Sequence, residues 1–222
     1  MATNSRRRKN RAINKAALRS AGLACCAVML MAGCSHSSTP AKSHPTATHV
    51  DDMIVGLDDV RRIAKADDLD RAEADLNKPA PSDANAPGPC RVVGHNDLTF
   101  GANWTEFRAA GYHGVTDDIQ PLGRAMINGV TQAAARYVNP GAAQGAFHQL
   151  ESSLQACMDL HDPNYSFTLD RPDPSTLRLS AHQWSHLYRT ESAYLVSVGV
   201  VGLESADQIA NSVLQIIADR IR

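Results

Sequence analysis

The fold of this chain is decided by residues 193–221, AYLVSVGVVGLESADQIANSVLQIIADRI. Residues 193–201 are rich in β-branched side chains and predict a strand. Behind them, Ser205 with Gln208 three residues later is typical of a capping box at the start of a helix. The helix itself is indicated by apolar residues at three- and four-residue spacing, namely Ile209, Val213, Ile216, Ile217 and Ile221. We expect this helix to pack on the sheet that the strand joins.

Three short segments upstream also have strand character. They are 165–169, 176–181 and 183–189, joined by the connections 171–174 and 190–192. Alternation of apolar and polar residues is plain in Leu177 and Leu179 and again from Trp184 to Tyr188. Consecutive strands with short links predict an antiparallel meander with one solvated face.

A second long helix is predicted to begin at Asn139-Pro140, with Asn as N-cap and Pro in the first turn. Its apolar stripe comprises Ala143, Phe147, Leu150, Leu154, Cys157 and Met158. Two strands should precede it, over 104–113 and 126–138, although residues 132–136 fit a helix equally well. A short strand is expected at 91–93, and a first helix near Leu57. The chain therefore reads as α+β, an antiparallel sheet with two main packed helices.

The N-terminal residues have the pattern of an export signal. Seven Lys and Arg precede a short apolar run that ends in Leu30-Met31-Ala32-Gly33-Cys34. This run is too short to span a membrane and resembles a lipobox, after which cleavage leaves the cysteine first and acylated. We expect residues 1–33 to be a lipoprotein signal peptide and residues 34–49, rich in Ser, Thr, Pro and His, to be a disordered tether. The alternative is ordinary cleavage with Cys34 a free thiol.

Removing this leader changes the charge of the chain. The remainder holds 15 of the 22 Lys and Arg and all 23 Asp and Glu, a net charge of −8. Such an acidic chain has no electrostatic footprint for nucleic acid and no basic patch for anionic lipid. We therefore expect no nucleic-acid partner, and contact with the membrane only through acyl chains on Cys34.

Only two cysteines remain in the folded part, Cys90 and Cys157. In an oxidising compartment they suggest one disulfide, and two buried free thiols are the alternative. Neither has the neighbours that would lower a thiol pKa, so redox catalysis is not indicated.

Residues 193–202 and the helix that follows resemble the end of the PknH-like extracellular sensor domain, found in a mycobacterial protein kinase and in freestanding lipoproteins. Supporting matches are 53–60, Pro89-Cys90 and 147–157, and the resemblance covers residues 50–222. It implies an α+β domain with an open cleft for an unidentified extracellular ligand. Cys90 and Cys157 match one family cystine. A second family pair falls at His186 and Val201, so the resemblance implies that this second bridge is absent.

The sequence carries no kinase, hydrolase or transferase signature. The first hypothesis is a non-catalytic, lipid-anchored lipoprotein on the extracytoplasmic face of the cell membrane, which binds or senses a small molecule, glycan or protein. Its cleft would use Tyr112, Trp184 or Tyr194, although each aromatic also fits a core position. A structural or protein-binding lipoprotein is the alternative.

A hydrolase is the lesser alternative, and its candidate residues are His113, Asp117 and Asp118. His182 and His186 would share one face of a strand, but no third ligand accompanies them. We therefore expect neither a metal nor another cofactor.

Overall fold

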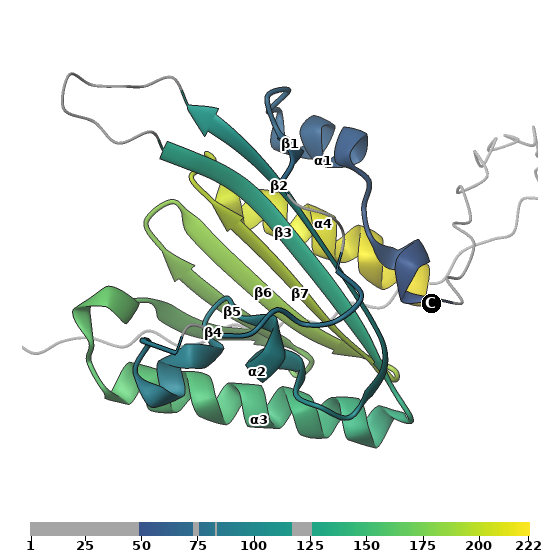
Figure 1. The fold of residues 1–222 in the computed structure, drawn as a ribbon, viewed down its shortest axis with the longest axis vertical. Coiled ribbons are helices and arrows are strands. Elements are labelled where there is room, and N and C mark those ends of the chain that lie inside the picture. Colours follow the sequence, from purple (N-terminus) through teal and green to yellow (C-terminus); the bar gives the residue numbers. More distant parts are fainter. Residues whose placement is uncertain (1–48, 73–75, 83, 117–125) are drawn as a thin grey trace, which may run out of the picture. The chain divides into compact units, whose positions relative to one another are not determined.

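The computed structural model describes residues 49–72, 76–82, 84–116 and 126–222. They belong to one compact unit built on a seven-stranded antiparallel sheet with the order β1-β2-β3-β7-β6-β5-β4 (Figure 1). The signal peptide, Cys34 and nearly all of the expected tether lie outside the described residues, as do Asp117 and Asp118. No helix within the described ranges combines the length and apolar character needed to cross a membrane.

The sheet consists of β1 (Asp70–Arg71), β2 (Trp104–Thr116), β3 (Met126–Tyr137), β4 (Thr168–Asp173), β5 (Thr176–Ala181), β6 (Trp184–Glu191) and β7 (Tyr194–Val201). The α-helices are α1 (Leu57–Ala64), α2 (Asn96–Phe100), α3 (Pro140–Asp159) and α4 (Ala206–Ile221). Short 3-10 helices are η1 (Val50–Met53), η2 (Gly88–Val92) and η3 (Pro163–Tyr165).

The topology joins a hairpin to a meander. Strands β2 and β3 form the hairpin, α3 crosses to the far edge of the sheet, and β4 to β7 return as the predicted meander. The last strand, β7, pairs with β3 from Gly129↔Val201 to Arg136↔Tyr194. Residues 132–136 are therefore strand, because this central position gives both edges of β3 a hydrogen-bonding neighbour.

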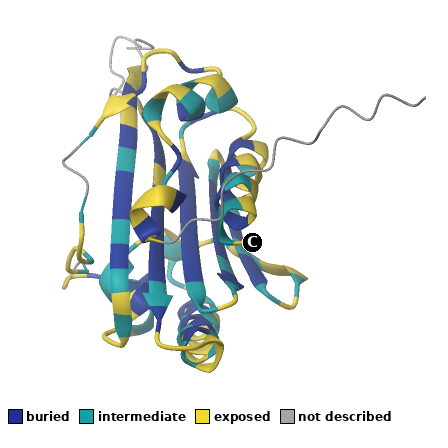
Figure 2. Ribbon diagram, turned by 90° about the vertical axis from the view of Figure 1, so that its right-hand side faces the viewer, coloured by how far each residue is buried: buried dark blue, intermediate teal, exposed yellow. Residues whose placement is uncertain are grey.

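Helices cover both faces of the sheet, so the expectation of one solvated face is wrong. We name the two sides the α4 face and the α3 face after their main helices. Alternate residues of β7 serve each side: Val196 and Val198 pack under α4, whereas Leu195 packs under α3. Figure 2 shows the consequence as nearly continuous burial along the central strands. The sequence suggested a solvated face because polar residues alternate with Leu177, Leu179, Trp184 and Tyr188, but one of these polar residues, Ser185, is buried.

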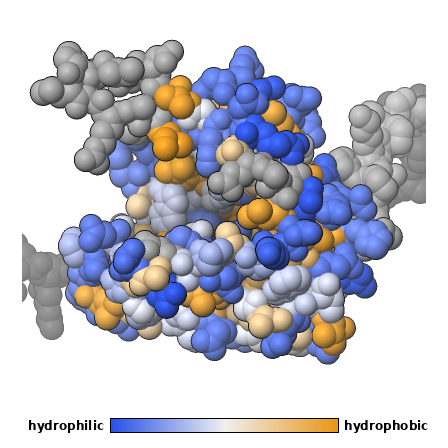
Figure 3. Space-filling view, viewed as in Figure 1, coloured by the Kyte–Doolittle hydropathy of each residue, from blue (hydrophilic) through white to orange (hydrophobic). Residues whose placement is uncertain are grey.

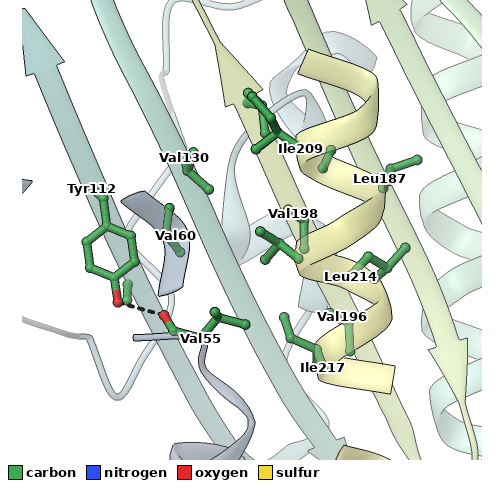
Figure 4. Packing of buried hydrophobic residues seen from close by; sticks show 14 of the residues in the cluster. Val55, Val60, Tyr112, Val130, Leu187, Val196, Val198, Ile209, Leu214 and Ile217 are labelled. Carbon is green, nitrogen blue, oxygen red and sulfur yellow. Dashed lines mark hydrogen bonds between the residues drawn. The ribbon is translucent and has the colours of Figure 1, made fainter. Parts of the chain in front are cut away.

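The α4 face is closed by tightly packed aliphatic side chains. Ile209, Leu214 and Ile217 of α4 lie over Val196 and Val198 of the sheet (Figure 4). The predicted packing of this helix on the meander is confirmed. Its predicted cap is wrong, because Ser205 has a left-handed backbone with φ of 58° and its side chain makes no capping hydrogen bond.

The start of the domain is fastened to the same face by polar contacts. The Gln132 amide donates to Val55 O at 2.7 Å and accepts from Val55 N at 2.8 Å, as a neighbouring strand would. Tyr112 Oη donates to the same carbonyl at 2.8 Å. At the other end of the chain, Arg220 Nη1 donates to the carbonyls of Asp52, Met53 and Ile54 at 2.9 to 3.2 Å.

On the α3 face, α3 begins as predicted. Asn139 Oδ1 accepts from Ala142 N at 2.9 Å, and Pro140 stands in the first turn. The disulfide joins Cys90 to Cys157 with a Cα–Cα distance of 4.7 Å, which confirms the predicted pair. The short strand expected at 91–93 is wrong, because these residues end η2, which holds Cys90, and pass into a turn that Gly88 and Pro89 favour.

Two smaller expectations also need correction. The fourth strand begins at Thr168 and continues through Arg171 and Pro172, which we expected to be a connection; as an edge strand it tolerates proline. His182 lies in the turn between β5 and β6, so it does not share a strand face with His186.

Candidate functional site

The α3 face changes character along its strands. Register pairing aligns Phe107, Ala135, Leu195 and Thr190 in one cross-strand row near α3. The next row holds Ala109, Ala133, Ser197 and Tyr188. All eight of these residues are buried, and most belong to the core under α3. One end of this face is therefore ordinary protein interior.

Farther from α3, the rows lose their large side chains on three neighbouring strands. One row aligns Gly111, Thr131, Gly199 and His186, and we call it the glycine row. The row beyond it aligns His113, Gly129, Val201 and Trp184. A glycine within a strand weakens packing and often marks a site where another group approaches the backbone closely. Here each of β2, β3 and β7 carries one on the same face.

The space above Gly199 and Gly129 could not hold a further side chain, whereas the space above Gly111 could. A Cβ built on Gly199 would stand 2.8 Å from Thr131 Oγ1 and 3.0 Å from His186 Nδ1. A Cβ on Gly129 would stand 2.8 Å from Cδ2 of the His113 ring, so that ring lies directly over β3. The glycines thus bring Thr131, His186 and His113 close together over bare backbone.

The result is a cavity of about 230 Å³ over the glycine row, which we call the glycine cavity. Its far wall includes Ala72 and Leu76 on one side and Gly94 and Asn96 on the other. None of the described lining residues is Asp, Glu, Lys or Arg. The space-filling view shows this side of the molecule hollowed at its centre, above α3 (Figure 3).

His186 is the most perturbed side chain of this cavity. It is 5% exposed, its Nε2 lies 2.7 Å from Ser197 Oγ, and its ring stacks on Tyr188 with 4.4 Å between centroids. Trp184 approaches the other side of the ring, edge on, at 6.1 Å. Burial lowers the pKa of His186 to about 3, so the ring is neutral at physiological pH.

A hydrogen-bonded histidine and serine also raise the question of nucleophilic catalysis. A general base works best with a pKa near the operating pH, and the pKa of His186 lies far below it. No carboxylate within the described ranges is hydrogen-bonded to His186, so the third member of a triad is not supplied there. The pair is better suited to presenting a polar ring edge to a ligand than to activating Ser197.

None of the three aromatic residues proposed for the cleft lines the glycine cavity in the described part of the chain, although Trp184 packs against His186, which does. Tyr112 is 1% exposed on the opposite, α4 face, where it supports Val55. Tyr194 also packs against the α4-face core. Both residues therefore pack in or against the core, which is the alternative that the sequence left open for each aromatic residue. The sequence could not separate the two because it does not show which face of a strand each residue occupies.

The candidate residues of the hydrolase alternative are divided. His113 does line the glycine cavity, whereas Asp117 and Asp118 lie outside the described residues. Within the described ranges, no three His, Cys, Asp or Glu side chains gather in a way that could hold a metal ion.

A larger hollow of about 650 Å³ lies between the end of α1 and the start of α4. It is lined by charges of both signs, including Lys65, Asp68 and Glu204. Its residues are mostly turn and helix-end groups. The smaller glycine cavity is the better candidate site, since it contains a buried histidine whose pKa is strongly lowered and its lining is mostly small and apolar.

Comparison with known proteins agrees with this architecture. The model of the PknH-like extracellular domain family matches residues 45–220. The chain belongs to this family. The fold is also similar to the crystal structure of the extracellular domain of PknH from Mycobacterium tuberculosis, with a TM-score of 0.58 and 13% identity over 81% of this chain and 98% of that one. No curated protein sequence matches the chain.

Membership confirms the resemblance found in the sequence and the α+β fold with its antiparallel sheet. A PknH-like extracellular domain is a sensor domain rather than a known catalytic one, and it works on the extracytoplasmic side. The positions expected for the absent second cystine, His186 and Val201, lie on neighbouring strands, where His186 pairs with Gly199 and Val201 with Trp184.

Proposed function

We propose that this protein is a non-catalytic ligand-binding or sensing lipoprotein, held at the extracytoplasmic face of the cell membrane by acyl chains on Cys34. Its ligand site is the glycine cavity. The observation that carries this proposal is the glycine cavity itself, because the sheet leaves a space of about 230 Å³ beside Gly111 that no described side chain fills. A domain with only a structural role gains nothing from that loss of buried area.

The arrangement of the domain supports binding rather than catalysis. The scaffold around the cavity is rigid, with central strands on the floor and a disulfide fixing the neighbouring η2 to α3. The polar groups at the floor, Thr131 and His186, are few and are fixed by packing. Sites with this combination of apolar walls and a few placed polar groups are typical of small-molecule recognition.

Native mass spectrometry of the protein purified gently from its own envelope tests the binding function. We expect a co-purifying small molecule, which disappears on denaturation and is much reduced in a Gly111→Ala variant that narrows the cavity. A Gly145→Ala variant is the matched control, because a methyl group there meets nothing within 4 Å. An equal load in both variants would place the ligand elsewhere, and no bound mass in any form would contradict the proposal.

The anchor is tested separately by intact mass. We expect a mature species that begins at Cys34 and carries acyl mass, with detergent needed for its extraction. Cys34→Ala should abolish both the added mass and the need for detergent. An unacylated wild-type protein would overturn the anchor while leaving the binding site open to the first experiment.

A further inference from the structure

The larger hollow on the α4 face also has the features of a binding site. It encloses about 650 Å³ between α1 and α4, and its floor includes Asn128 of β3, so we call it the Asn128 hollow. We propose that the Asn128 hollow binds a neutral, polyhydroxylated molecule of the size of a monosaccharide or disaccharide. This inference adds a second site to the proposed function and does not depend on the ligand of the glycine cavity.

The observation that carries the inference is the side-chain amide of Asn128. Asn128 is 6% exposed, and its Oδ1 is buried against Gly202 without a hydrogen-bond partner. Nδ2 also has no hydrogen bond to a residue in the described ranges, but it is not buried, so this end of the amide opens to the hollow. Burying an amide without its hydrogen bonds costs free energy. A ligand oxygen over Asn128 would accept from Nδ2 and reduce that cost.

A carboxylate lies next to this amide. Asn128 pairs with Gly114 of β2, and a Cβ built on Gly114 would stand 3.1 Å from Asp68 Cγ. The Asp68 carboxylate therefore lies over β2, on the same face as the Asn128 side chain and at the neighbouring position of the sheet. The floor of the hollow thus presents a hydrogen-bond donor and an acceptor side by side.

The walls continue this mixture of groups. Polar side chains come from the end of α1, the turn before β6 and the start of α4, namely Lys65, Gln183, Glu204 and Gln208. Leu203 and Ile209 add apolar surface between them. A sugar ring carries hydroxyl groups around its edge and C–H groups on its faces. A lining that combines amides, carboxylates and aliphatic side chains can contact both.

The charges in the lining favour a neutral ligand. Asp68 and Glu204 repel an anion, whereas Lys65 repels a cation. A ligand with a single charge is therefore attracted by one wall and repelled by another. Hydroxyl groups avoid this conflict, because each can donate to a carboxylate and accept from an amide or an ammonium group.

The dimensions of the hollow agree with such a ligand. Pockets for small molecules hold about 300 to 1,000 Å³, and the Asn128 hollow lies within this range. Lys65, Gln183 and Ser205 at its rim have left-handed backbone, with φ of 53° to 58°. Residues other than glycine adopt this conformation mainly in turns and at functional sites.

Four neutral sugars test the inference: glucose, galactose, mannose and arabinose. Glucuronate and glucosamine are the charged counterparts. The protein is the full chain carrying Cys34→Ala, and the readout is the NMR shift of the Asn128 side-chain NH₂ group and of the Gly202 and Gln208 backbone amides. We expect saturable shifts with at least one neutral sugar at millimolar concentration. Both charged counterparts should bind at least about threefold more weakly than the best neutral sugar.

Two variants test the location. Asn128→Leu replaces the amide by an apolar group of similar shape, which should leave the domain folded because no hydrogen bond within the described ranges is lost. Ser212→Phe places a large side chain in the hollow from an exposed position of α4. Each should weaken binding of the best sugar at least about tenfold. Asn164→Leu, at an exposed asparagine in η3, is the matched control and should leave binding unchanged.

Each contrary result overturns a stated part of the inference. Equal or tighter binding of glucuronate or glucosamine would overturn the ligand class. Binding that is unchanged in Asn128→Leu or Ser212→Phe would overturn the site, as would the absence of a saturable shift with every sugar at about 100 mM. If Asn128→Leu does not fold, Ser212→Phe decides the location. The co-purification experiment with Gly111→Ala tests the glycine cavity separately, so the two proposals can fail independently.

Discussion

The two faces of the sheet are built on the same strands but serve different purposes. On the α4 face, side chains such as Val196, Val198 and Ile217 pack between the helix and the sheet and are at most 1% exposed. On the α3 face, packing is equally tight under α3 but stops at the glycine row, beyond which Val115 and Ile127 are exposed. The difference shows that the buried core of this domain occupies the α4 face and the part of the α3 face that lies under α3. The part of the α3 face beyond the glycine row is left free for recognition.

The largest expected effect comes from the disulfide, which holds η2 to α3 beside the cavity. Replacing both cysteines (Cys90→Ser with Cys157→Ser) removes a bridge between residues 67 positions apart in the sequence. The variant should lose about 4 kcal/mol in the free energy of unfolding, because its unfolded chain is no longer constrained. Urea denaturation of the oxidised wild type and of the variant measures this. A loss below about 1 kcal/mol would show that the α3 end holds together without the bridge.

The next comparison is between a buried residue of the α4 face and an exposed residue beyond the glycine row on the α3 face. Ile217→Ala removes a fully buried side chain of α4 and should cost about 3 kcal/mol. Ile127→Ala removes a side chain that is 61% exposed and should change stability by less than about 0.5 kcal/mol. Similar losses of stability in the two variants would mean that Ile127 is covered in solution and that the two faces do not differ as described.

A third test uses pH. Burial keeps His186 neutral in the folded protein down to about pH 3, whereas the unfolded chain takes up a proton near pH 6.5. Stability should therefore fall as pH drops from 6.5, by up to about 1.4 kcal/mol per unit, or about 2 kcal/mol by pH 4.5. The carboxylates with lowered pKa, Glu106 and Asp173, contribute only below this window.

His186→Gln should flatten this slope relative to the wild type in urea titrations at each pH. The exposed His148→Gln is a control that should not, since its ring is largely in water in either state. A wild-type slope unchanged by His186→Gln would contradict the burial of a neutral ring.

The smallest effects distinguish two glycines of one row. Gly199→Ala pushes a methyl group against Thr131 and His186 and should cost about 1 to 2 kcal/mol, since overpacking forces neighbours to move. Gly111→Ala makes only ordinary contacts and should lie within about 0.5 kcal/mol of the wild type. Thermal unfolding of both variants compares them, and equal costs would show that the cavity is uniformly tight.

Much of the fold could be predicted because its signals are local. The Asn139-Pro140 start of α3, the aliphatic periodicity of α4 and the β-branched run of β7 each lie within a few turns of sequence. Short elements were missed or misjudged for the same reason. Residues 96–100 hold only one turn of α2, and Ser205 adopts a left-handed backbone that is uncommon for a residue other than glycine.

The candidate site could not be predicted from local sequence signals. The glycine row exists only when β2, β3 and β7 are aligned, and Gly111 and Gly199 are 88 positions apart in a sequence with 14 glycines. Each of them inside a strand pattern was a signal of close approach, but the pairing register was needed to see that they share a face. Trp184, which packs on His186, was proposed because it is aromatic, whereas His186 was considered only as a metal ligand and as the position of a missing family cysteine.

The contacts of Arg220 and Gln132 have a mechanical consequence. At the start of the domain, the backbone carbonyls of Asp52 and Ile54 accept hydrogen bonds from Arg220 in the last helix. The carbonyl of Val55 accepts one from Gln132 in the central strand β3. A pull on the N-terminal segment is therefore shared at once between the final helix and the middle of the sheet, instead of peeling one edge. A domain tethered at that end, as we propose, can bear load there while its binding row stays in register.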